Sequence, residues 1–158
     1  MNGYAEKEVR LEQLLPLILE SLEQGKTVTF APRGISMLPM LRQGRDTVTL
    51  APICRELKKY DLPLYRRDDG AFILHRIVGA GETFTCIGDN QYELEHGVRR
   101  DQMIAVVTSF ARSGKQVAVT DLRYLLYCRF WHWSRPVRRF LSRVKGYLRR
   151  KWRALRSR

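Results

Sequence analysis

Three short segments, far apart in the sequence, contain the residue types of a hydrolytic site. They place a serine at position 36, a histidine at 75 and an aspartate at 89. A serine hydroxyl attacks a carbonyl carbon when an imidazole takes its proton, and a carboxylate orients that imidazole. Many chains contain all three residue types, so the surrounding residues decide whether these three predict a site.

The residues around Ser36 read Arg-Gly-Ile-Ser-Met-Leu-Pro over positions 33–39. Gly34 permits backbone angles that other residues avoid, and it allows a peptide to approach the chain closely. Pro39 fixes the backbone just beyond the serine. Taken alone, a serine in such a segment is typical of an ordinary turn.

His75 interrupts an otherwise apolar run over residues 72–78, a composition typical of a central strand. A histidine on such a strand is often a hydrogen-bonded core residue. Asp89 stands between Gly88 and Asn90, and all three residue types favour turns. Neither segment predicts catalysis by itself.

Taken together, the three segments resemble the signal peptidase I family in its endoplasmic-reticulum and archaeal-type branch. The matching boxes are Gly-Ile-Ser-Met-Leu-Pro, His-Arg-Ile-Val and Gly-Asp-Asn, within residues 26–110. The resemblance implies Ser36 as nucleophile, His75 as general base and Asp89 as the carboxylate that orients the base. Bacterial-type members have a lysine in the second box, so the histidine here implies a Ser/His enzyme.

Further roles follow from the same resemblance. Family members often have a second acid six residues after the aspartate; that position is Glu95, which we expect to be auxiliary. Arg76 is expected to hold a structural carboxylate or a backbone carbonyl. The Ser36 backbone N–H and one neighbouring donor are expected to form the oxyanion hole. The residues predicted to line the oxyanion and substrate-binding region are Gly34, Ile35, Met37 and Pro39. No metal and no cofactor is expected.

The body that would position these residues is predicted to be mainly β. Helical spacing of leucines predicts a helix over residues 6–24, with a kink or break at Pro16. Short β-type runs then predict strands at 27–31, 47–51, 62–65, 71–78, 83–87, 103–111 and 116–120. Tight turns between them favour an antiparallel folded sheet or barrel. We therefore divide the chain into an N-terminal helix (1–25), a catalytic β domain (26–120) and a helical tail (121–158).

The tail differs from the body in charge. Residues 1–121 contain 16 Lys/Arg and 16 Asp/Glu, whereas residues 122–158 contain 13 Lys/Arg and no acid. Apolar residues recur at helical spacing along this basic segment, which predicts an amphipathic helix that Ser134 can cap. Whatever such a helix binds is expected to be anionic.

An anionic membrane surface is the partner predicted for residues 122–158, because aromatic and basic side chains together suit the interface of a bilayer. The predicted membrane-contacting residues are Trp131, Trp133, Arg138, Arg139, Arg143, Arg149 and Trp152. Docking of the apolar stripe on the β domain is an alternative. Nucleic acid is not expected as a partner, since no helix-turn-helix is evident.

The predicted function is therefore a serine endopeptidase that cleaves signal- or leader-type peptides. Two alternatives remain: an inactive peptide-binding module of the same fold, and a nucleic-acid-binding regulator that cleaves itself. The sequence shows no secretory signal and no apolar run long enough to span a membrane. Three cysteines without metal or disulfide spacing favour a reducing compartment. We thus expect a peripheral enzyme on the cytoplasmic side.

Overall fold

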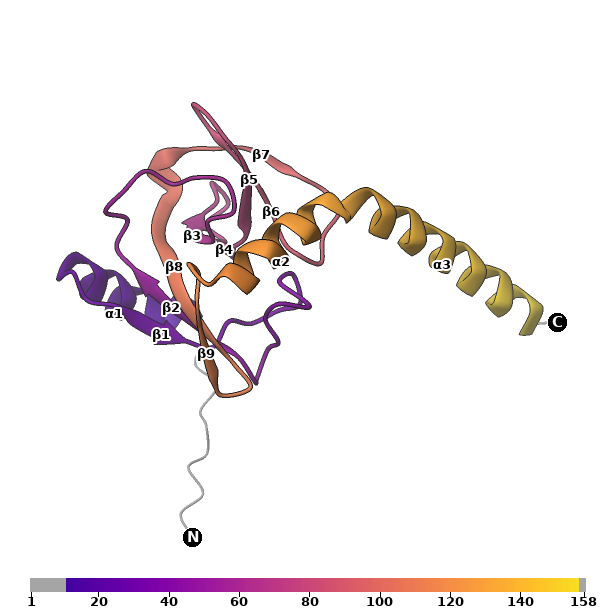
Figure 1. Ribbon diagram of the computed structural model, residues 1–158, viewed down its shortest axis with the longest axis horizontal. Helices are drawn as coiled ribbons and strands as arrows, with labels where there is room; N and C mark the ends of the chain where they lie inside the picture. The colour runs from indigo at the N-terminus through magenta and orange to yellow at the C-terminus, as the bar shows by residue number, and fades with distance from the viewer. Residues whose placement is uncertain (1–10, 157–158) are drawn as a thin grey trace, which may run out of the picture.

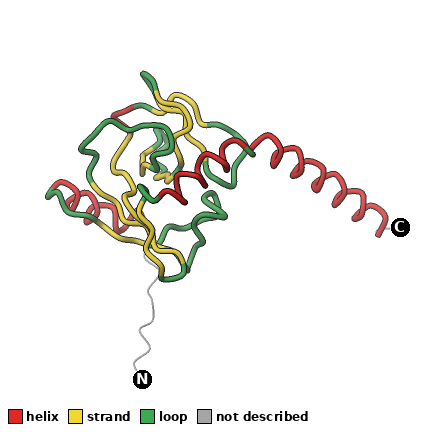
Figure 2. Tube along the Cα trace, in the orientation of Figure 1, coloured by secondary structure: helices red, strands yellow, loops and turns green. Residues whose placement is uncertain are grey.

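The computed structural model describes residues 11–156 of the chain (Figure 1). A β body lies between an N-terminal helix and two C-terminal helices (Figure 2). The helices are α1 (Leu11–Glu23), α2 (Leu122–Trp133) and α3 (Arg135–Arg156), with a short 3-10 helix η1 (Arg100–Gln102). The strands are β1 (Val28–Phe30), β2 (Thr47–Ala51), β3 (Pro63–Arg66), β4 (Phe72–Leu74), β5 (Arg76–Ala80), β6 (Phe84–Ile87), β7 (Glu95–Val98), β8 (Met103–Arg112) and β9 (Lys115–Ala118).

The strands form two antiparallel sheets. Six strands make the larger sheet in the order β1-β2-β8-β3-β4, with β9 paired to β8, and β5-β6-β7 make the smaller one. The predicted mainly β folded-sheet architecture is therefore confirmed, although the strands of residues 11–156 do not close into a barrel. The long strand β8 pairs with β2, β3 and β9.

The predicted strand at 71–78 is two strands. β4 pairs with β3 in the larger sheet, whereas β5 pairs with β6 in the smaller sheet. His75 is the single residue between them. Apart from His75 and Arg76 the run is apolar on both sides of the change, with β4 partly buried and the first three residues of β5 buried. Its composition therefore could not reveal the change of sheet.

Strand β7 was not predicted, because Glu-His-Gly-Val lacks both alternation and β-branched residues except at its end. Its pairing with β6 forms it: Val98 lies opposite Phe84, and Glu95 lies opposite Cys86. This pairing brings Glu95 to the smaller sheet, next to the β5 end that follows His75.

Two hydrophobic clusters hold the body together. The first includes Ile18 and Leu22 of α1, Met40 and Leu41 from the segment after Ser36, and Tyr124 and Cys128 of α2. The second cluster includes Tyr65 of the larger sheet and Ile77 and Phe84 of the smaller sheet, so it joins the two sheets. A kink or a break was predicted at Pro16; helix α1 is continuous through this residue, so there is no break. Pro16 is exposed, and solvent can satisfy the carbonyl that loses its intrahelical bond. Residues 6–10 of the predicted helix lie outside the described residues.

The tail forms two helices that differ in their contacts. Helix α2 begins after Asp121, whose side chain accepts the amide N–H groups of Arg123 and Tyr124. Ser134 lies between the helices, and its hydroxyl donates to the Trp131 carbonyl at 3.2 Å. Helix α3 extends away from the β body (Figure 1).

Candidate functional site

The first and third boxes lie side by side. Ser36 is in the turn-rich segment between β1 and β2, and its carbonyl oxygen accepts the Asn90 amide N–H at 2.8 Å. A Cβ atom added to Gly88 would lie 2.7 Å from the same carbonyl oxygen. Only glycine permits this approach, so the Gly-Asp-Asn box is matched to the serine segment by packing.

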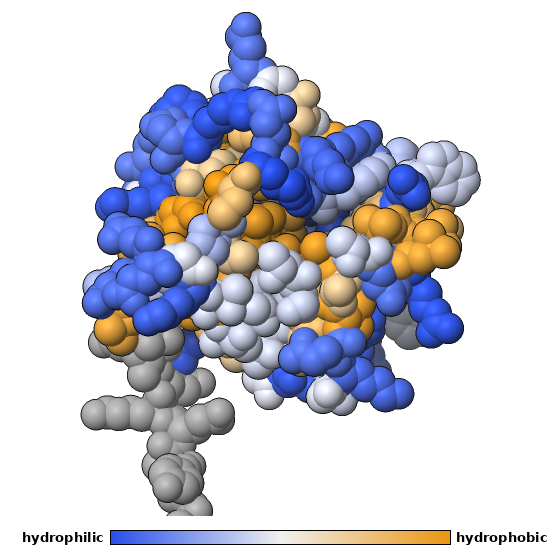
Figure 3. All heavy atoms as spheres, turned by 60° about the vertical axis from the view of Figure 1, so that its left-hand side comes forward, coloured by the Kyte–Doolittle hydropathy of each residue, from blue (hydrophilic) through white to orange (hydrophobic). Residues whose placement is uncertain are grey.

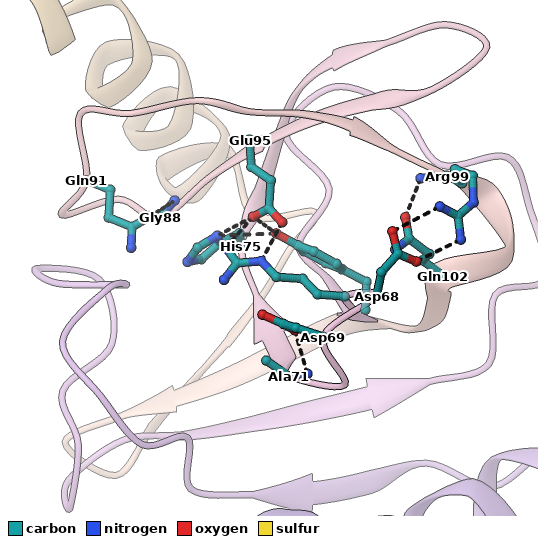
Figure 4. Close-up of polar contacts among 11 residues, drawn as sticks. Asp68, Asp69, Ala71, His75, Gly88, Gln91, Glu95, Arg99 and Gln102 are labelled. Carbon is teal, nitrogen blue, oxygen red and sulfur yellow. Dashed lines mark hydrogen bonds and ion pairs between the residues drawn. The ribbon is translucent and has the colours of Figure 1, made fainter.

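His75 is buried, with 3% of its surface exposed, at the passage from β4 to β5. Its Nδ1 atom lies 3.4 Å from the Tyr65 hydroxyl and 3.7 Å from Glu95 Oε2. Figure 4 shows these contacts converging between His75 and Glu95. Polar groups therefore face the Nδ1 atom of His75, although Tyr65 also belongs to the second hydrophobic cluster.

Glu95 is held in place by hydrogen bonds from two residues. Arg67 binds it through Nε at 2.5 Å and Nη2 at 2.6 Å, and the Tyr65 hydroxyl donates to Oε2 at 2.6 Å. The Arg67 guanidinium, more than the Tyr65 hydroxyl, lowers the pKa of the Glu95 carboxyl. Glu95 is thus an ionised carboxylate at neutral pH, within ion-pair distance of His75.

Asp89 faces a different residue. Its Oδ1 accepts Arg76 Nε at 2.9 Å, and its Oδ2 accepts Arg76 Nη2 at 2.8 Å and the Tyr127 hydroxyl at 3.0 Å. Among the described residues, no hydrogen bond joins Asp89 to His75. The structural role predicted for Arg76 is confirmed, while the orienting role of Asp89 stays a prediction.

Arg76 is buried and connects the site to the rest of the molecule. Its Nη1 donates to the Tyr124 hydroxyl at 2.7 Å and to Cys128 Sγ at 2.9 Å, and its Nη2 lies 3.0 Å from Met40 Sδ. Burial opposes its charge, but the Asp89 carboxylate outweighs it and holds the pKa of Arg76 above its usual value. Helix α2, the serine segment and the Asp89 loop therefore meet at one guanidinium.

The hydrogen bond expected between Ser36 and His75 is not formed among the residues that the structure describes. Among residues 11–156, neither the Ser36 hydroxyl nor Nε2 of His75 has a hydrogen-bond partner. Ser36 is half-buried. Catalytic hydrogen bonds are often long without substrate and shorten when the complex forms.

The protonation state of His75 suits a general base. Burial lowers its pKa to about 4, and the neighbouring Glu95 carboxylate opposes that shift only in part. The imidazole is therefore neutral at pH 7 and has a lone pair that can take a proton from a serine hydroxyl.

The predicted substrate-binding residues divide between surface and core. Gly34 has a φ of 94°, and its amide N–H donates to Gln43 Oε1 at 2.8 Å. Ile35 is exposed and Pro39 is half-buried. Met37 is buried in the first hydrophobic cluster, which favours a packing role over contact with substrate. Its side chain fixes the serine turn to the body.

Tyr65 and Arg67 were missed as site residues in the sequence. Tyr65 is fully buried on β3 and pairs with Ile73, two residues before His75. In the sequence, Tyr65-Arg66-Arg67 looks like the end of a strand. The only hint of function there is a tyrosine followed closely by arginines. The pairing of strands, which a single sequence does not reveal, brings both residues to Glu95.

Helix α2 also reaches the Asp89 loop. The Trp131 indole N–H donates to the Asp89 carbonyl at 2.7 Å, and Arg138 Nη1 donates to the same oxygen at 3.3 Å. Arg138 lies over the Trp131 ring at 3.7 Å from its centroid. These positions favour a role in holding the loop, so Trp131 and Arg138 fit membrane contact poorly.

The remaining predicted membrane-contacting residues are exposed. They are Trp133, Arg139, Arg143, Arg149 and Trp152. Large apolar residues of α3 are also exposed: Val137, Phe140, Leu141, Val144, Leu148 and Trp152. The apolar stripe therefore does not dock on the β domain, and that alternative is wrong. Apolar side chains reach the surface in Figure 3, including a group on the side from which α3 extends in Figure 1.

Two further observations concern membrane spans and metal-binding clusters. Within residues 11–156, no helix is long and apolar enough to cross a membrane. The same residues contain no cluster of three or more histidine, cysteine, aspartate or glutamate side chains arranged to hold a metal ion.

Comparisons of the chain with protein-family models, with curated proteins and with solved structures gave no match. The functional assignment therefore depends on the geometry of the residues described above.

Proposed function

We propose that this protein is a serine endopeptidase, with Ser36 as nucleophile and His75 as general base. The observation that carries the proposal is the environment of His75: a buried, neutral imidazole whose Nδ1 faces Tyr65 and Glu95. An imidazole held at Nδ1 is oriented for proton transfer at Nε2. The bond from Asn90 to Ser36 supports the proposal because it fixes the serine segment beside the Gly-Asp-Asn box.

In the proposed reaction, Ser36 Oγ attacks the scissile carbonyl carbon while its proton passes to His75 Nε2. In this proposal the backbone N–H of Ser36 donates a hydrogen bond to the oxyanion of the tetrahedral intermediate. The leaving amine then takes the proton from His75, and an acyl-serine ester remains. A water molecule, deprotonated by the same imidazole, hydrolyses the ester and restores the serine.

Asp89 and Glu95 have different parts in this scheme. The nearby charge of each raises the pKa of His75, Glu95 more strongly than Asp89. Asp89 also pairs with Arg76, and this pair ties the loop that contacts Ser36 to β5. Glu95 acts from the Nδ1 side of the ring.

Signal- or leader-type peptides are the proposed substrates. A surface depression beside Glu95 is lined by Arg67 and by residues 91–95, and it gives an extended peptide access to this side of the molecule. The exposed Ile35 supports contact with substrate next to the nucleophile. Extended peptides fit such surface depressions through main-chain bonds and alternating side chains.

The experiment that tests the proposal is acylation by a β-lactone probe, whose ring opens as the serine ester forms, followed by mass spectrometry of the labelled peptide. We expect labelling at Ser36 in the unaltered protein and its loss in Ser36→Ala and His75→Ala. Ser21→Ala, in helix α1, is the matched control and should label normally. Equal labelling of Ser36→Ala and the unaltered protein would refute the assigned nucleophile. Absence of labelling in all of these proteins, with folding intact, would favour an inactive peptide-binding module.

We also propose that α2 and α3 place the enzyme on an anionic membrane surface, on the cytoplasmic side. Exposed apolar residues on α3 lie among basic side chains, with no acid after Asp121. That combination suits insertion at the level of lipid headgroups. The three cysteines are free thiols, which fits a reducing compartment.

A further inference from the structure

We infer that Tyr65 is the positioning residue for His75: its hydroxyl oxygen accepts a hydrogen bond from the Nδ1–H of the imidazole, and its hydroxyl hydrogen is donated in a second hydrogen bond to Glu95 Oε2. The catalytic meaning of this contact rests on the proposed function, whereas the contact itself does not. Tyr65 has no exposed surface and lies on β3, in the larger sheet. Glu95 begins β7, in the smaller sheet. The Tyr65 hydroxyl therefore links His75, which precedes β5, to a strand of each sheet.

The number of hydrogens that each group can donate decides the direction of the hydrogen bonds among Tyr65, Glu95 and His75. A tyrosine hydroxyl has one proton to donate, and an ionised carboxylate accepts only. Arg67 keeps Glu95 ionised, and the Tyr65 oxygen lies 2.6 Å from Glu95 Oε2. At that distance the phenolic proton must lie between the two oxygens, because without it their lone pairs would repel.

The Tyr65 oxygen can then act only as an acceptor toward His75. The ring nitrogen at 3.4 Å must supply the proton, so the neutral imidazole has its hydrogen on Nδ1. The reverse arrangement, with Tyr65 donating to Nδ1, would leave Glu95 Oε2 without that proton. The lone pair of the ring is consequently on Nε2, the nitrogen that a base needs toward a serine hydroxyl.

This arrangement also explains how a carboxylate helps a base that it does not touch directly. Glu95 Oε2 and His75 Nδ1 are 3.7 Å apart, too far for a hydrogen bond but close enough for ion pairing. When Nε2 takes the serine proton, Nδ1 keeps its own, and the positive ring is stabilised through Tyr65 by the Glu95 charge. Burial, more than Glu95, raises the pKa of Tyr65, so the phenol keeps its proton throughout.

The test uses the full chain and reads the tautomer of His75 directly. Two-bond proton–nitrogen spectra of the imidazole distinguish an N–H nitrogen from a lone-pair nitrogen, and His75→Gln identifies its signals. At neutral pH we expect an Nδ1–H tautomer in the unaltered protein. Tyr65→Phe and Glu95→Gln should each give a mixture of tautomers and reduce the rate of Ser36 acylation by about tenfold, as expected for one lost hydrogen bond.

Tyr124→Phe is the matched control, because Tyr124 is another buried tyrosine whose hydroxyl bonds Arg76 instead of His75. It should leave the His75 tautomer unchanged even if the protein loses stability. An Nε2–H tautomer in the unaltered protein overturns the inference, as does an unchanged tautomer in folded Tyr65→Phe. An Nδ1–H tautomer without any Ser36 labelling supports the contact and refutes the peptidase, so the two failures are distinguishable.

Discussion

Asp89 is paired with Arg76, and the two side chains share two short contacts in the interior of the protein, at 2.8 and 2.9 Å. Each is 2% exposed. A charge in such a place is costly when its partner is removed, whereas the intact pair contributes little net stability. The pair therefore serves to fix geometry: it joins the loop beside Ser36 to β5 and, through Tyr124 and Tyr127, to helix α2.

Breaking this pair should destabilise the protein strongly. Arg76→Gln leaves the buried Asp89 carboxylate without its counter-charge, and we expect a loss of about 3–5 kcal/mol in the free energy of unfolding. Urea denaturation measures this change. Asp68→Asn is the control, because the Asp68–Arg99 pair is exposed and its removal should change the free energy of unfolding little. Similar losses in both variants would contradict the structural role given to Arg76.

The pH dependence of acylation should report the buried His75. As the proposed base, His75 acts when neutral, and its pKa is about 4 in the folded chain against an ordinary value of 6.5. The rate of Ser36 labelling should therefore stay constant from pH 7 to about pH 5 and fall as pH passes through about 4. Because the unfolded chain takes up that proton at higher pH, His75 also lowers stability as pH falls from 6.5 towards 4. A labelling rate that already falls as pH passes through 6.5 would contradict this prediction, because it would show that the His75 imidazole is exposed or mobile.

Gly88→Ala tests the approach between the first and third boxes. The added methyl group would lie 2.7 Å from the Ser36 carbonyl oxygen and 3.1 Å from Gln91, so the serine segment must shift. We expect a loss of about 1–3 kcal/mol in stability, typical of overpacking, together with slower acylation of Ser36. Gly81→Ala is the control: its nearest neighbour would be 3.9 Å away, so it should preserve both properties.

Removing exposed apolar side chains from α3 should weaken membrane binding without unfolding the body. Phe140 and Trp152 are 66% and 68% exposed, so a Phe140→Ala/Trp152→Ala protein should keep its melting temperature. Sedimentation with vesicles rich in phosphatidylserine should show binding reduced by roughly tenfold or more, since both side chains lose apolar contact with lipid.

Vesicles of phosphatidylcholine alone and random-sequence DNA are the controls for this experiment. The unaltered protein should bind the neutral vesicles weakly, because the proposed binding depends on attraction between the basic residues of α3 and anionic headgroups. Salt-sensitive binding to DNA without binding to anionic vesicles would instead favour the nucleic-acid alternative.

Local patterns in the sequence were enough to predict much of the architecture. The strands at 47–51 and 103–111 follow from β-branched and apolar runs, and they correspond closely to β2 and β8. The basic amphipathic character of the tail follows from helical spacing. These features depend on neighbours along the chain, so a single sequence contains their signal.

Contacts across the fold decided the rest of the candidate site. The sequence assigned the orienting carboxylate to Asp89 by position in a motif, whereas the structure pairs Asp89 with Arg76 and brings Glu95 and Tyr65 to His75. Two facts produce this outcome: the chain changes sheets at His75, and β7 pairs with β6 in a register that brings Glu95 to the site. Neither fact has a local signal, because strand register and the choice of partner sheet are set by packing between segments distant in sequence. The sequence by itself therefore determined which residues are available for chemistry, and only the tertiary structure decided which of them face one another.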